Sequence, residues 1–399
     1  MKKIDEAKIQ HLLNRGVENI FPTREFLEKA LKSGKKLTIY MGIDPTGELH
    51  IGHAIPLRKL KEFQDLGHNV IVLIGDFTAQ IGDPTDKAAV RKKLTRKQVL
   101  ENAKDYRKLI GKILDLRKSN IRFLHNEKWT NKLKPVDMLE LASHFTVSRL
   151  LERDMFQERI KQGKEIYLHE FLYPIFQAYD SVTMNVDGEI GGNDQMFNML
   201  AGRTLMKKIL NKEKFVITTR LLEDTTGKKM GKTEGNIIAL KDSPAEMFGK
   251  VMSWNDEMIL PGFELLTDIT DKGIKMFSQA LDKGENPRHI KFKLAEEVVK
   301  MFYGQEKADK AGESFNKQFR EKEKPKDMEE MKVSQKMMNI VDLLFEVGLA
   351  GSKSEARRLV EQGGVKIDDT KITDVKEVLG IHGGMIVQVG KRKFVKLKV

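Results

Sequence analysis

Short apolar runs alternate with longer amphipathic stretches over roughly the first 240 residues. Leu37–Ile43, Val70–Ile74 and Phe215–Thr219 are rich in β-branched and aliphatic residues, whereas Ile51–Phe63 carries apolar residues at helical spacing. Strands that are apolar throughout are typical of a parallel sheet covered by helices on both faces. The pattern therefore predicts an α/β domain over residues 1–241.

The pattern changes after Asp242. No further strand-like run occurs up to about residue 319, and Ser243-Pro244-Ala245-Glu246 offers a helix start, with a capping serine, a proline in the first turn and a glutamate three residues on. We therefore expect an all-helical domain over 242–319. Residues 320–335 are nearly all charged and contain a proline, which predicts a linker. Residues 336–399 combine helical segments with short β-like runs separated by glycines, which predicts a small α+β domain.

Composition narrows the class of protein. No run of eighteen apolar residues is long enough to span a bilayer, so we expect no membrane partner. The start of the chain, MKKIDEAKIQ, lacks the apolar core of a signal peptide, and the absence of cysteine excludes a disulfide framework. These features predict a cytoplasmic location. The net charge of +13 favours a polyanionic partner such as nucleic acid.

Two histidines stand at a predicted strand–turn–helix junction, in His50-Ile51-Gly52-His53. Such a junction is the binding edge of an open α/β sheet, and a helix N-terminus there presents unpaired N–H groups to phosphates. Imidazoles three residues apart share roughly one helix face, and Gly52 would let a flat nucleotide lie against the backbone. Two alternatives stay open: a pair of surface histidines beside a small packing residue, or a zinc pair, for which no further ligand has a recognisable spacing.

A lysine-rich stretch, Lys229-Met230-Gly231-Lys232-Thr233, is a second candidate for phosphate binding. It is not a P-loop, because three residues rather than four separate Gly227 from Gly231 and no strand leads directly into it. A loop that clamps a polyphosphate after it binds is the better interpretation. A basic turn exposed to solvent is the alternative.

Together, HIGH at 50–53 and KMGKT at 229–233 resemble the two signature motifs of class I aminoacyl-tRNA synthetases, HIGH and KMSKS, in the same order. Glycine and threonine replace the two serines; both are small and one keeps a hydroxyl. The whole chain resembles the bacterial-type tyrosyl-tRNA synthetases. Four further stretches carry that resemblance: Tyr40-x-Gly42-x-Asp44-Pro45-Thr46, Ile81-Gly82-Asp83-Pro84-Thr85, Tyr173-Pro174-x-x-Gln177-Ala178-Tyr179-Asp180 and Gly191-Gly192-x-Asp194-Gln195.

The resemblance implies a Rossmann-like nucleotide-binding sheet and a ligase. L-tyrosine and ATP would give tyrosyl-adenylate and pyrophosphate, and the tyrosyl group would pass to the 3′ end of tRNA(Tyr). Magnesium would arrive with the nucleotide, so no protein-bound metal is expected. Because the substrate carboxylate is itself the nucleophile, the protein has to position groups and stabilise charge rather than supply a catalytic triad.

The resemblance also implies roles for individual residues. The side chains around the reacting phosphates of ATP would be Thr46, His50, His53, Lys87, Arg91, Lys229, Lys232 and Thr233. ATP contacts would include Gly52, Gly191, Asp194, Met230 and Lys232. Tyrosine contacts would be Tyr40, Gly42, Asp44, Asp83, Tyr173, Gln177, Asp180 and Gln195.

Selectivity would rest on Tyr40 and Asp180, which match the positions that recognise the phenol hydroxyl. Phenylalanine would leave both unpaired, a discrimination for which tyrosyl-tRNA synthetase is itself the standard example. Two positions depart from the family pattern on the ammonium side of the pocket. Glu189 stands where some relatives carry glutamine, and Met-Phe-Asn follows Gln195 in place of Trp-Gly-Asn. Without the neighbouring motifs, residues 173–180 would also fit an amphipathic helix with tyrosines in the core.

The C-terminal stretch LLFEVGLAGSKSEARRLVEQGGVKIDD resembles a small RNA-binding fold named after a ribosomal small-subunit protein. Its RNA-facing residues would be Ser352, Lys353, Arg357 and Arg358, which would contact phosphates without reading sequence. A basic, solvated tail is the alternative. By the same resemblance, residues 242–319 would lie against the anticodon stem, and residues of about 125–200 would form a homodimer interface.

Two other functions stay open at this point. A tryptophan-specific relative is possible because an aspartate can accept an indole N–H; the Tyr40–Asp180 pair and the basic tail favour tyrosine. An RNA-binding protein that kept the fold but lost catalysis is the other, against which the intact His50, His53, Lys229 and Lys232 count.

Overall fold

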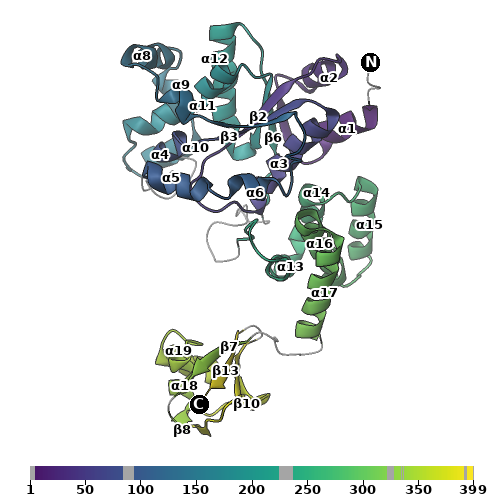
Figure 1. Cartoon of the computed structure of the whole chain (residues 1–399), viewed down its shortest axis with the longest axis vertical. Coiled ribbons are helices and arrows are strands. Elements are labelled where there is room, and N and C mark those ends of the chain that lie inside the picture. Colours follow the sequence, from purple (N-terminus) through teal and green to yellow (C-terminus); the bar gives the residue numbers. More distant parts are fainter. Residues whose placement is uncertain are drawn as a thin grey trace. The chain divides into compact units, whose positions relative to one another are not determined.

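The computed structural model describes residues 5–83, 94–223, 237–320, 328–333, 335, 337–390 and 393–398. The chain forms two compact units, Met1–Gly312 and Glu313–Val399, which are described separately (Figure 1). Six predicted site residues lie outside the described residues: Lys87, Arg91, Lys229, Met230, Lys232 and Thr233.

A six-stranded sheet forms the centre of the first unit. Its order is β1-β6-β5-β2-β3-β4, and all neighbours are parallel except β1 and β6, which are antiparallel. Every residue of β6 is buried, as are five of six in β3, which is why these strands read as continuous apolar runs. The predicted α/β fold is confirmed. The strands are β1 Val17–Phe21, β2 Thr38–Ile43, β3 Asn69–Ile74, β4 Ile121–His125, β5 Gly188–Gly192 and β6 Phe215–Thr219.

Helix α3, Ile51–Leu66, covers one face of this sheet. Its Leu57, Leu60 and Phe63 are fully buried, and the Phe63 ring stacks on Phe215 of β6 with centroids 5.9 Å apart. The helices around the sheet are α1 Glu6–Asn14, α2 Arg24–Lys32, α4 Thr78–Ile81, α5 Arg96–Ala103, α6 Tyr106–Ile110, α7 Glu127–Thr130, the 3₁₀ turn η1 Asn193–Gln195 and α12 Met196–Leu210. Between β4 and β5 come α8 Pro135–Ser143, α9 Val147–Leu151, α10 Asp154–Lys161 and α11 Leu168–Met184.

Only helices and turns follow residue 242 within the first unit's described residues. The predicted helix start is confirmed, because Ser243 caps α13: its Oγ accepts from the Glu246 N–H at 3.3 Å, and the Glu246 carboxylate accepts from the Ser243 N–H at 2.9 Å. Phe248, Phe263 and Leu294 form the centre of this region's core. Its elements are α13 Pro244–Met252, η2 Asp256–Met258, α14 Ile259–Leu266, α15 Asp271–Asp282, α16 Pro287–Tyr303 and α17 Gln305–Arg320.

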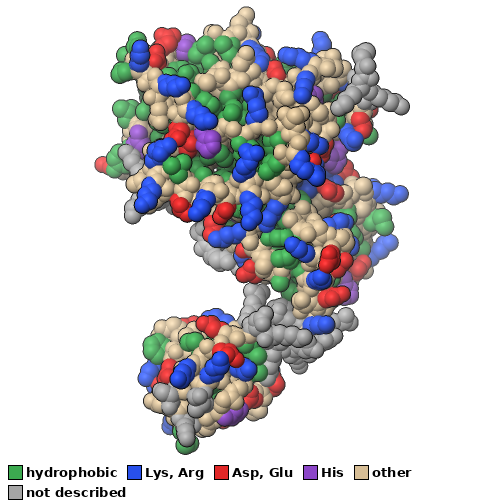
Figure 2. All heavy atoms as spheres, in the orientation of Figure 1, with side chains coloured by type: hydrophobic (Ala, Val, Ile, Leu, Met, Phe, Trp, Pro, Cys, Tyr) green, Lys and Arg blue, Asp and Glu red, His purple; other side chains and the backbone are tan. Residues whose placement is uncertain are grey.

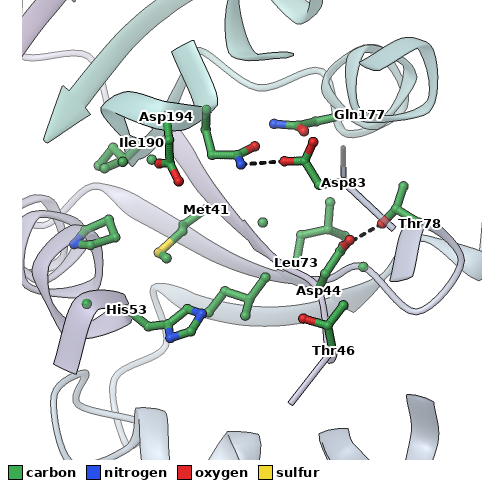
Figure 3. A pocket seen from close by; sticks show the side chains of 18 of the residues that line it. Met41, Asp44, Thr46, His53, Leu73, Thr78, Asp83, Gln177, Ile190 and Asp194 are labelled. Atoms are coloured by element: carbon green, nitrogen blue, oxygen red, sulfur yellow. Dashed lines mark hydrogen bonds between the residues drawn. The ribbon is translucent and has the colours of Figure 1, made fainter. Parts of the chain in front are cut away.

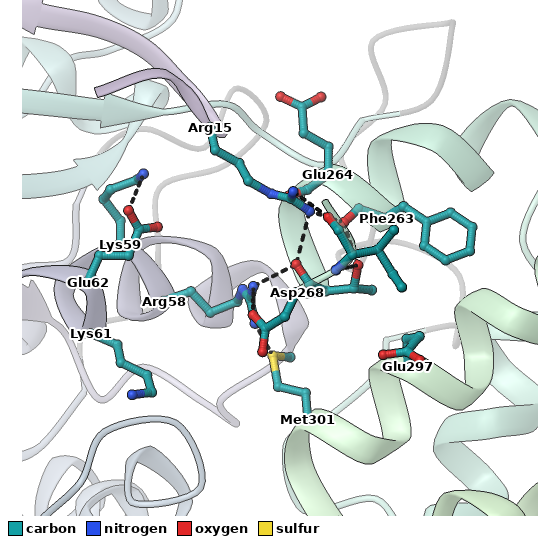
Figure 4. Close-up of polar contacts among 12 residues, drawn as sticks. Arg15, Arg58, Lys59, Lys61, Glu62, Phe263, Glu264, Asp268, Glu297 and Met301 are labelled. Carbon is teal, nitrogen blue, oxygen red and sulfur yellow. Dashed lines mark hydrogen bonds and ion pairs between the residues drawn. The ribbon is translucent and has the colours of Figure 1, made fainter. Parts of the chain in front are cut away.

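Two arginines attach the helical region to the α/β region (Figure 4). Arg15, which follows α1, is almost fully buried and donates to the carbonyl oxygens of Phe263 at 2.8 Å and Thr267 at 3.0 Å. Arg58 of α3 donates to the Thr267 carbonyl at 2.8 Å and to Asp268 at 2.7 Å. The middle of α3, the helix that His50 caps, is therefore fixed against the helical region.

The described residues of the second unit comprise the end of α17, the helices α18 and α19, and short strands. Its main sheet has the order β10-β9-β12-β13-β7, and β11 pairs with β8. The elements are β7 Glu329–Lys332, β8 Met337–Asn339, α18 Ile340–Glu346, α19 Lys353–Glu361, β9 Val365–Ile367, β10 Thr370–Ile372, β11 Val378–Gly380, β12 Ile386–Val389 and β13 Lys393–Lys398.

Strand β7 corrects the predicted linker. Residues 329–332 were expected to lie in a linker over 320–335, but they pair in parallel with β13 at the edge of the sheet. The Glu330 carboxylate forms ion pairs with Lys396, at 3.3 Å, and with Lys398, while Val333 is buried. A charged sequence is a common property of an exposed edge strand as well as of a linker, which explains the error.

Candidate active site

A cavity of about 620 Å³ opens where β2 and β5 end (Figure 3). The order of the strands reverses between these two neighbours, which is the position where open α/β sheets bind their ligands. The cavity brings together every described residue that we expected to contact tyrosine or ATP: Tyr40, Gly42, Asp44, Thr46, His50, Gly52, His53, Asp83, Tyr173, Gln177, Asp180, Gly191, Asp194 and Gln195.

The two histidines cap the N-terminus of α3. The Nδ1 of His50 accepts from the Gly52 N–H at 3.2 Å, and the Nδ1 of His53 accepts from the His50 N–H at 3.2 Å. Because Nδ1 accepts in each ring, a neutral imidazole carries its hydrogen on Nε2 and presents a donor there. The ring centroids lie 4.0 Å apart, so the pair acts as one polar surface at a helix N-terminus.

The segment that follows the lysine-rich motif runs beside the histidines. The Ile51 N–H donates to the Ile238 carbonyl at 2.9 Å, and the Leu240 N–H donates to the Leu49 carbonyl at 2.8 Å. The backbone at the start of the HIGH motif thus pairs directly with the segment that follows the KMGKT motif, although the two are far apart in sequence. Residues 224–236 themselves lie outside the described residues.

Small residues keep the cavity open near the histidines. A Cβ at Gly42 would meet no atom within 4 Å, whereas one at Gly52 would lie 3.0 Å from the His50 ring and one at Gly191 would lie 3.0 Å from the Met199 sulfur. Thr46 is exposed at the mouth of the cavity, where its side chain appears beside Asp44 in Figure 3.

Two carboxylates lie in the middle of the cavity. Asp44 accepts from the Tyr173 hydroxyl at 2.9 Å and from the Thr78 hydroxyl at 2.7 Å. Asp83 accepts from the Gln195 amide at 2.6 Å and from Arg153 at 3.1 Å. Burial, together with the charge of Asp44, raises the pKa of the Tyr173 phenol well above its ordinary value, so this hydroxyl stays a donor. Negative charge at this depth suits an ammonium group.

The closed end of the cavity is formed by Tyr40 and Asp180, which are 0% and 2% exposed. The two carboxylate oxygens of Asp180 accept from the Trp129 indole N–H at 2.7 Å and from the Asn126 amide at 3.2 Å. Burial raises the pKa of the Asp180 carboxyl well above its usual range, an effect that these two hydrogen bonds oppose. The Tyr40 hydroxyl lies 2.9 Å from the Ser181 hydroxyl.

Several residues of the site were not found from the sequence. Asn126 follows β4 directly and Trp129 lies in the next turn, so polar side chains at the carboxyl end of a strand would have been the signal; this strand was not among those predicted. Ser181 and Lys214 had no such signal. Lys214 is fully buried and forms an ion pair with Glu189, the position noted above as a departure from the family pattern; Glu189 also accepts from the Gln177 amide at 2.9 Å.

The four predicted RNA-facing residues are exposed on the second unit. Ser352 caps α19 by accepting from the Glu355 N–H at 3.1 Å, and Lys353 forms an ion pair with Asp342 at 2.7 Å. Arg357 and Arg358 project from the same helix. A contact with RNA stays a prediction.

The described ranges contain neither a metal-binding cluster nor a membrane-spanning helix. No group of three or more His, Asp or Glu side chains there is arranged to hold a metal ion. None of the helices in those ranges combines the length and apolar character that crossing a membrane requires.

Comparison with known proteins agrees with this geometry. Residues 32–320 match the family model of class I tRNA synthetases for tryptophan and tyrosine, and residues 320–397 match that of the tyrosine–tRNA ligase SYY-like C-terminal domain. The chain is 46% identical over 389 residues to the tyrosine–tRNA ligase of Thermotoga maritima, covering 97% of this chain and 96% of the relative. It is 45% identical over 407 residues to that of Carboxydothermus hydrogenoformans, covering 99% and 98%.

A solved structure shares the fold. The C-terminally truncated mitochondrial tyrosyl-tRNA synthetase of Coccidioides posadasii matches with a TM-score of 0.63 at 25% identity, covering 77% of this chain and 91% of that one. The first family model covers both tryptophan and tyrosine enzymes, whereas the relatives named above, which align with nearly the whole chain, are tyrosine–tRNA ligases. The chain therefore belongs to the tyrosine–tRNA ligase family of class I tRNA synthetases.

Proposed function

We propose that this cavity joins L-tyrosine and ATP to form tyrosyl-adenylate and pyrophosphate, and that the tyrosyl group then passes to tRNA(Tyr). One observation supports the proposal: a single cavity has a buried end with a hydroxyl and a carboxyl group, at Tyr40 and Asp180, and an imidazole-capped helix N-terminus at His50 and His53. The cytoplasmic location predicted for such an enzyme of protein synthesis stays a prediction.

Tyrosine would lie with its phenol at the closed end. Its hydroxyl can donate one hydrogen bond, which Asp180 would accept, and can accept one, which Tyr40 would donate. Its ammonium group would lie near Asp44 and Asp83, with Tyr173, Gln177 and Gln195 holding these carboxylates and their surroundings in place. Phenylalanine would fill the buried end without offering the oxygen that the Tyr40 hydrogen would meet or the hydrogen that Asp180 would accept, and leaving these buried hydrogen bonds unmade is costly.

ATP would bind as its magnesium complex with its phosphates at the N-terminus of α3. A carboxylate oxygen of tyrosine attacks the α-phosphorus, the bond to the bridging oxygen breaks, and pyrophosphate leaves with the bonding electrons. Negative charge grows on the leaving group, so donors that tighten at that moment raise the rate rather than only the affinity. Thr46, His50 and His53 are such donors here; Lys87, Arg91, Lys229, Lys232 and Thr233 are proposed to add theirs.

A pyrophosphate-exchange assay with each amino acid in turn tests this function. Exchange of labelled pyrophosphate into ATP should depend on L-tyrosine. Exchange with tryptophan in place of tyrosine would contradict the proposed specificity. No exchange with any amino acid, in a folded protein that binds tRNA, would favour an RNA-binding protein without catalysis.

The second unit is proposed to hold the tRNA through Ser352, Lys353, Arg357 and Arg358, with residues 242–319 against the anticodon stem. Ending the chain after Arg320 keeps α17 and removes β7 together with the rest of the C-terminal sheet. Transfer of tyrosine to tRNA should fall by at least about 100-fold, because several phosphate contacts would be lost together. Tyrosine-dependent exchange should change less than about twofold. Loss of exchange in a folded truncated chain would contradict the assignment.

A homodimer is proposed through the helices between β4 and β5. Four large apolar side chains in the described residues there are more than 60% exposed: Val136 at 65%, Leu139 at 72%, Val147 at 67% and Leu168 at 79%. Figure 2 shows hydrophobic side chains at the surface over the part of the first unit that carries these helices in Figure 1. Exposed apolar groups gathered in one region mark an interaction surface. The Leu139→Glu, Leu168→Glu double variant should sediment as a monomer, whereas the Met276→Glu variant, at an exposed position on α15, should keep the dimer.

A further inference from the structure

A buried chain of polar groups lies behind Tyr40. The Lys214 ammonium donates to the Ser181 hydroxyl at 2.9 Å, and the Ser181 hydroxyl lies 2.9 Å from the hydroxyl of Tyr40. Lys214 also forms an ion pair with Glu189, which accepts from the Gln177 amide. Lys214, Ser181 and Tyr40 are 0% exposed and Glu189 is 1% exposed, so the chain is closed to solvent on the protein side.

The fold leaves space for the Lys214 ammonium group, although burying a charge is unfavourable. A Cβ at position 202 would lie 2.6 Å from the Lys214 Nζ and 2.9 Å from the Ser181 Oγ, so glycine in α12 leaves the space that the ammonium and hydroxyl occupy. Burial lowers the pKa of Lys214, and the adjacent Glu189 carboxylate opposes that shift. Replacing a buried ion pair by apolar residues is often neutral or stabilising. Stability alone is therefore a weak reason to keep this pair.

The direction of the hydrogen bonds follows from counting hydrogens. An ammonium group has three donors and no acceptor, so the Ser181 oxygen must accept from Lys214. The single hydrogen of Ser181 is then available for the Tyr40 oxygen, its other recorded partner. Glu189, the nearby anion, accepts from Lys214 on one carboxylate oxygen and from Gln177 on the other, and each oxygen keeps a further lone pair. Tyr40 thus accepts from Ser181 and its own hydrogen stays available: the Glu189 carboxylate is one acceptor for it, and a substrate oxygen in the cavity is the other.

We propose that Lys214 and Ser181 are positioning residues that fix Tyr40 as a donor toward the substrate hydroxyl. The inference rests on the proposed function of the cavity. The substrate oxygen would accept from Tyr40 and give its own hydrogen to Asp180. Only a group with one donor and one good acceptor satisfies both, so an aromatic amine in place of the hydroxyl is rejected: its two N–H groups meet a second donor at Tyr40.

The test is a comparison of three amino acids in tyrosine-dependent pyrophosphate exchange. The ratios of kcat/KM for L-tyrosine over 4-amino-L-phenylalanine and over L-phenylalanine are measured in the full chain. The Lys214→Met, Glu189→Gln double variant removes both charges together, so no buried charge is left alone. Ser181 is then able to accept from Tyr40, which in turn accepts from an amine.

In the double variant, the ratio of tyrosine over 4-aminophenylalanine should fall about tenfold, the effect of one misdirected hydrogen bond. Activity with phenylalanine should fall by a smaller factor, because the altered contact between residue 189 and Gln177 affects all three amino acids alike whereas the misdirected hydrogen bond concerns only those with a polar ring substituent. Ser181→Ala should lower the same ratio, by less, because Tyr40 then loses its partner without gaining an acceptor. Thr183→Ala, at an exposed position of α11, and Lys310→Met with Glu306→Gln, at an exposed ion pair of α17, are the matched controls and should leave both ratios unchanged.

Two results would overturn the inference. An unchanged ratio in a double variant that unfolds thermally like the parent would show that the pair does not set the direction. An equal loss for all three amino acids would show that it only supports the fold. If the double variant fails to fold, the ratio measured for Ser181→Ala decides alone. A parent protein without tyrosine-dependent exchange would refute the proposed function instead, which keeps the two failures apart.

Discussion

The two ends of the cavity are built in opposite ways. At the phenol end, Tyr40 and Asp180 are buried and hydrogen-bonded within the protein, to Ser181 and to Trp129 and Asn126 respectively. At the phosphate end, Thr46 is exposed and the two histidines are partly exposed at a helix N-terminus. The other side chains predicted to contact phosphate belong to residues 84–93 and 224–236, which lie outside the described residues.

This difference matches what each end has to do. Choosing between tyrosine and phenylalanine requires polar groups whose positions are fixed and desolvated in advance, since an unmade hydrogen bond is costly only in a buried site. Stabilising a leaving pyrophosphate requires donors that engage most strongly in the transition state. We therefore expect substitutions at the phenol end to change which amino acid is used, and substitutions at the phosphate end to change how fast any amino acid is used.

The largest effect is expected for Asp180→Asn. The variant loses a charged acceptor for the substrate hydroxyl, and the amide N–H₂ would face the Trp129 or Asn126 donors. The kcat/KM for tyrosine in pyrophosphate exchange should fall about 100-fold, which corresponds to a charged hydrogen bond, while KM for ATP stays within about threefold. Asp282→Asn, at an exposed position of α15, is the control. A similar fall in kcat/KM for phenylalanine would contradict the view that the phenol end acts on the choice of amino acid.

A smaller effect is expected for His50→Asn at the phosphate end. Asparagine caps a helix well, so α3 should keep its start, but the imidazole Nε2 donor is gone. The kcat for activation should fall about tenfold with tyrosine and with phenylalanine alike, leaving their ratio unchanged.

His50→Ala separates the cap from the chemistry. It should show the same kinetic loss as His50→Asn and, in addition, lower the free energy of unfolding by about 1 kcal/mol, because the Gly52 N–H loses its partner. A change in the ratio of tyrosine to phenylalanine in either variant would mean that the phosphate end also selects the amino acid.

The same contrast explains what the sequence could and could not reveal. The phosphate end follows local patterns, such as an apolar strand, a turn and HIGH at a helix start, and the structure places its described members, Thr46, His50 and His53, at the cavity. Their contact with phosphate stays a prediction. The partners that fix the phenol end are scattered: Tyr40 and Ser181 are 141 residues apart. Lys214 was missed because a lysine next to a strand is ordinarily exposed, and only the packing shows that it is not. Strand β7 was missed for a related reason, since charge at a sheet edge resembles charge in a linker.

The smallest effect is expected for alkaline pH, and it sharpens the comparison because it concerns the phenol end alone. Burial, together with the charges of Glu189 and Asp180, raises the pKa of the Tyr40 phenol well above 10.0. A raised pKa keeps the neutral, donating form below that value, so the ratio of kcat/KM for tyrosine over phenylalanine should stay constant from about pH 7 to 9. Titration of the substrate amino group affects both amino acids and cancels in this ratio.

On the acid side the ratio should decline, because the raised pKa of Asp180 means that its carboxylate takes up a proton above 3.8, the ordinary value, and then no longer accepts from the substrate hydroxyl. The measurement is the pair of kcat/KM values across pH, with Asp180→Asn as the reference that should show no decline. A ratio that fell between pH 7 and 9 would mean that Tyr40 ionises there, and the phenol end would then not be the preorganised site that its burial and hydrogen bonds indicate.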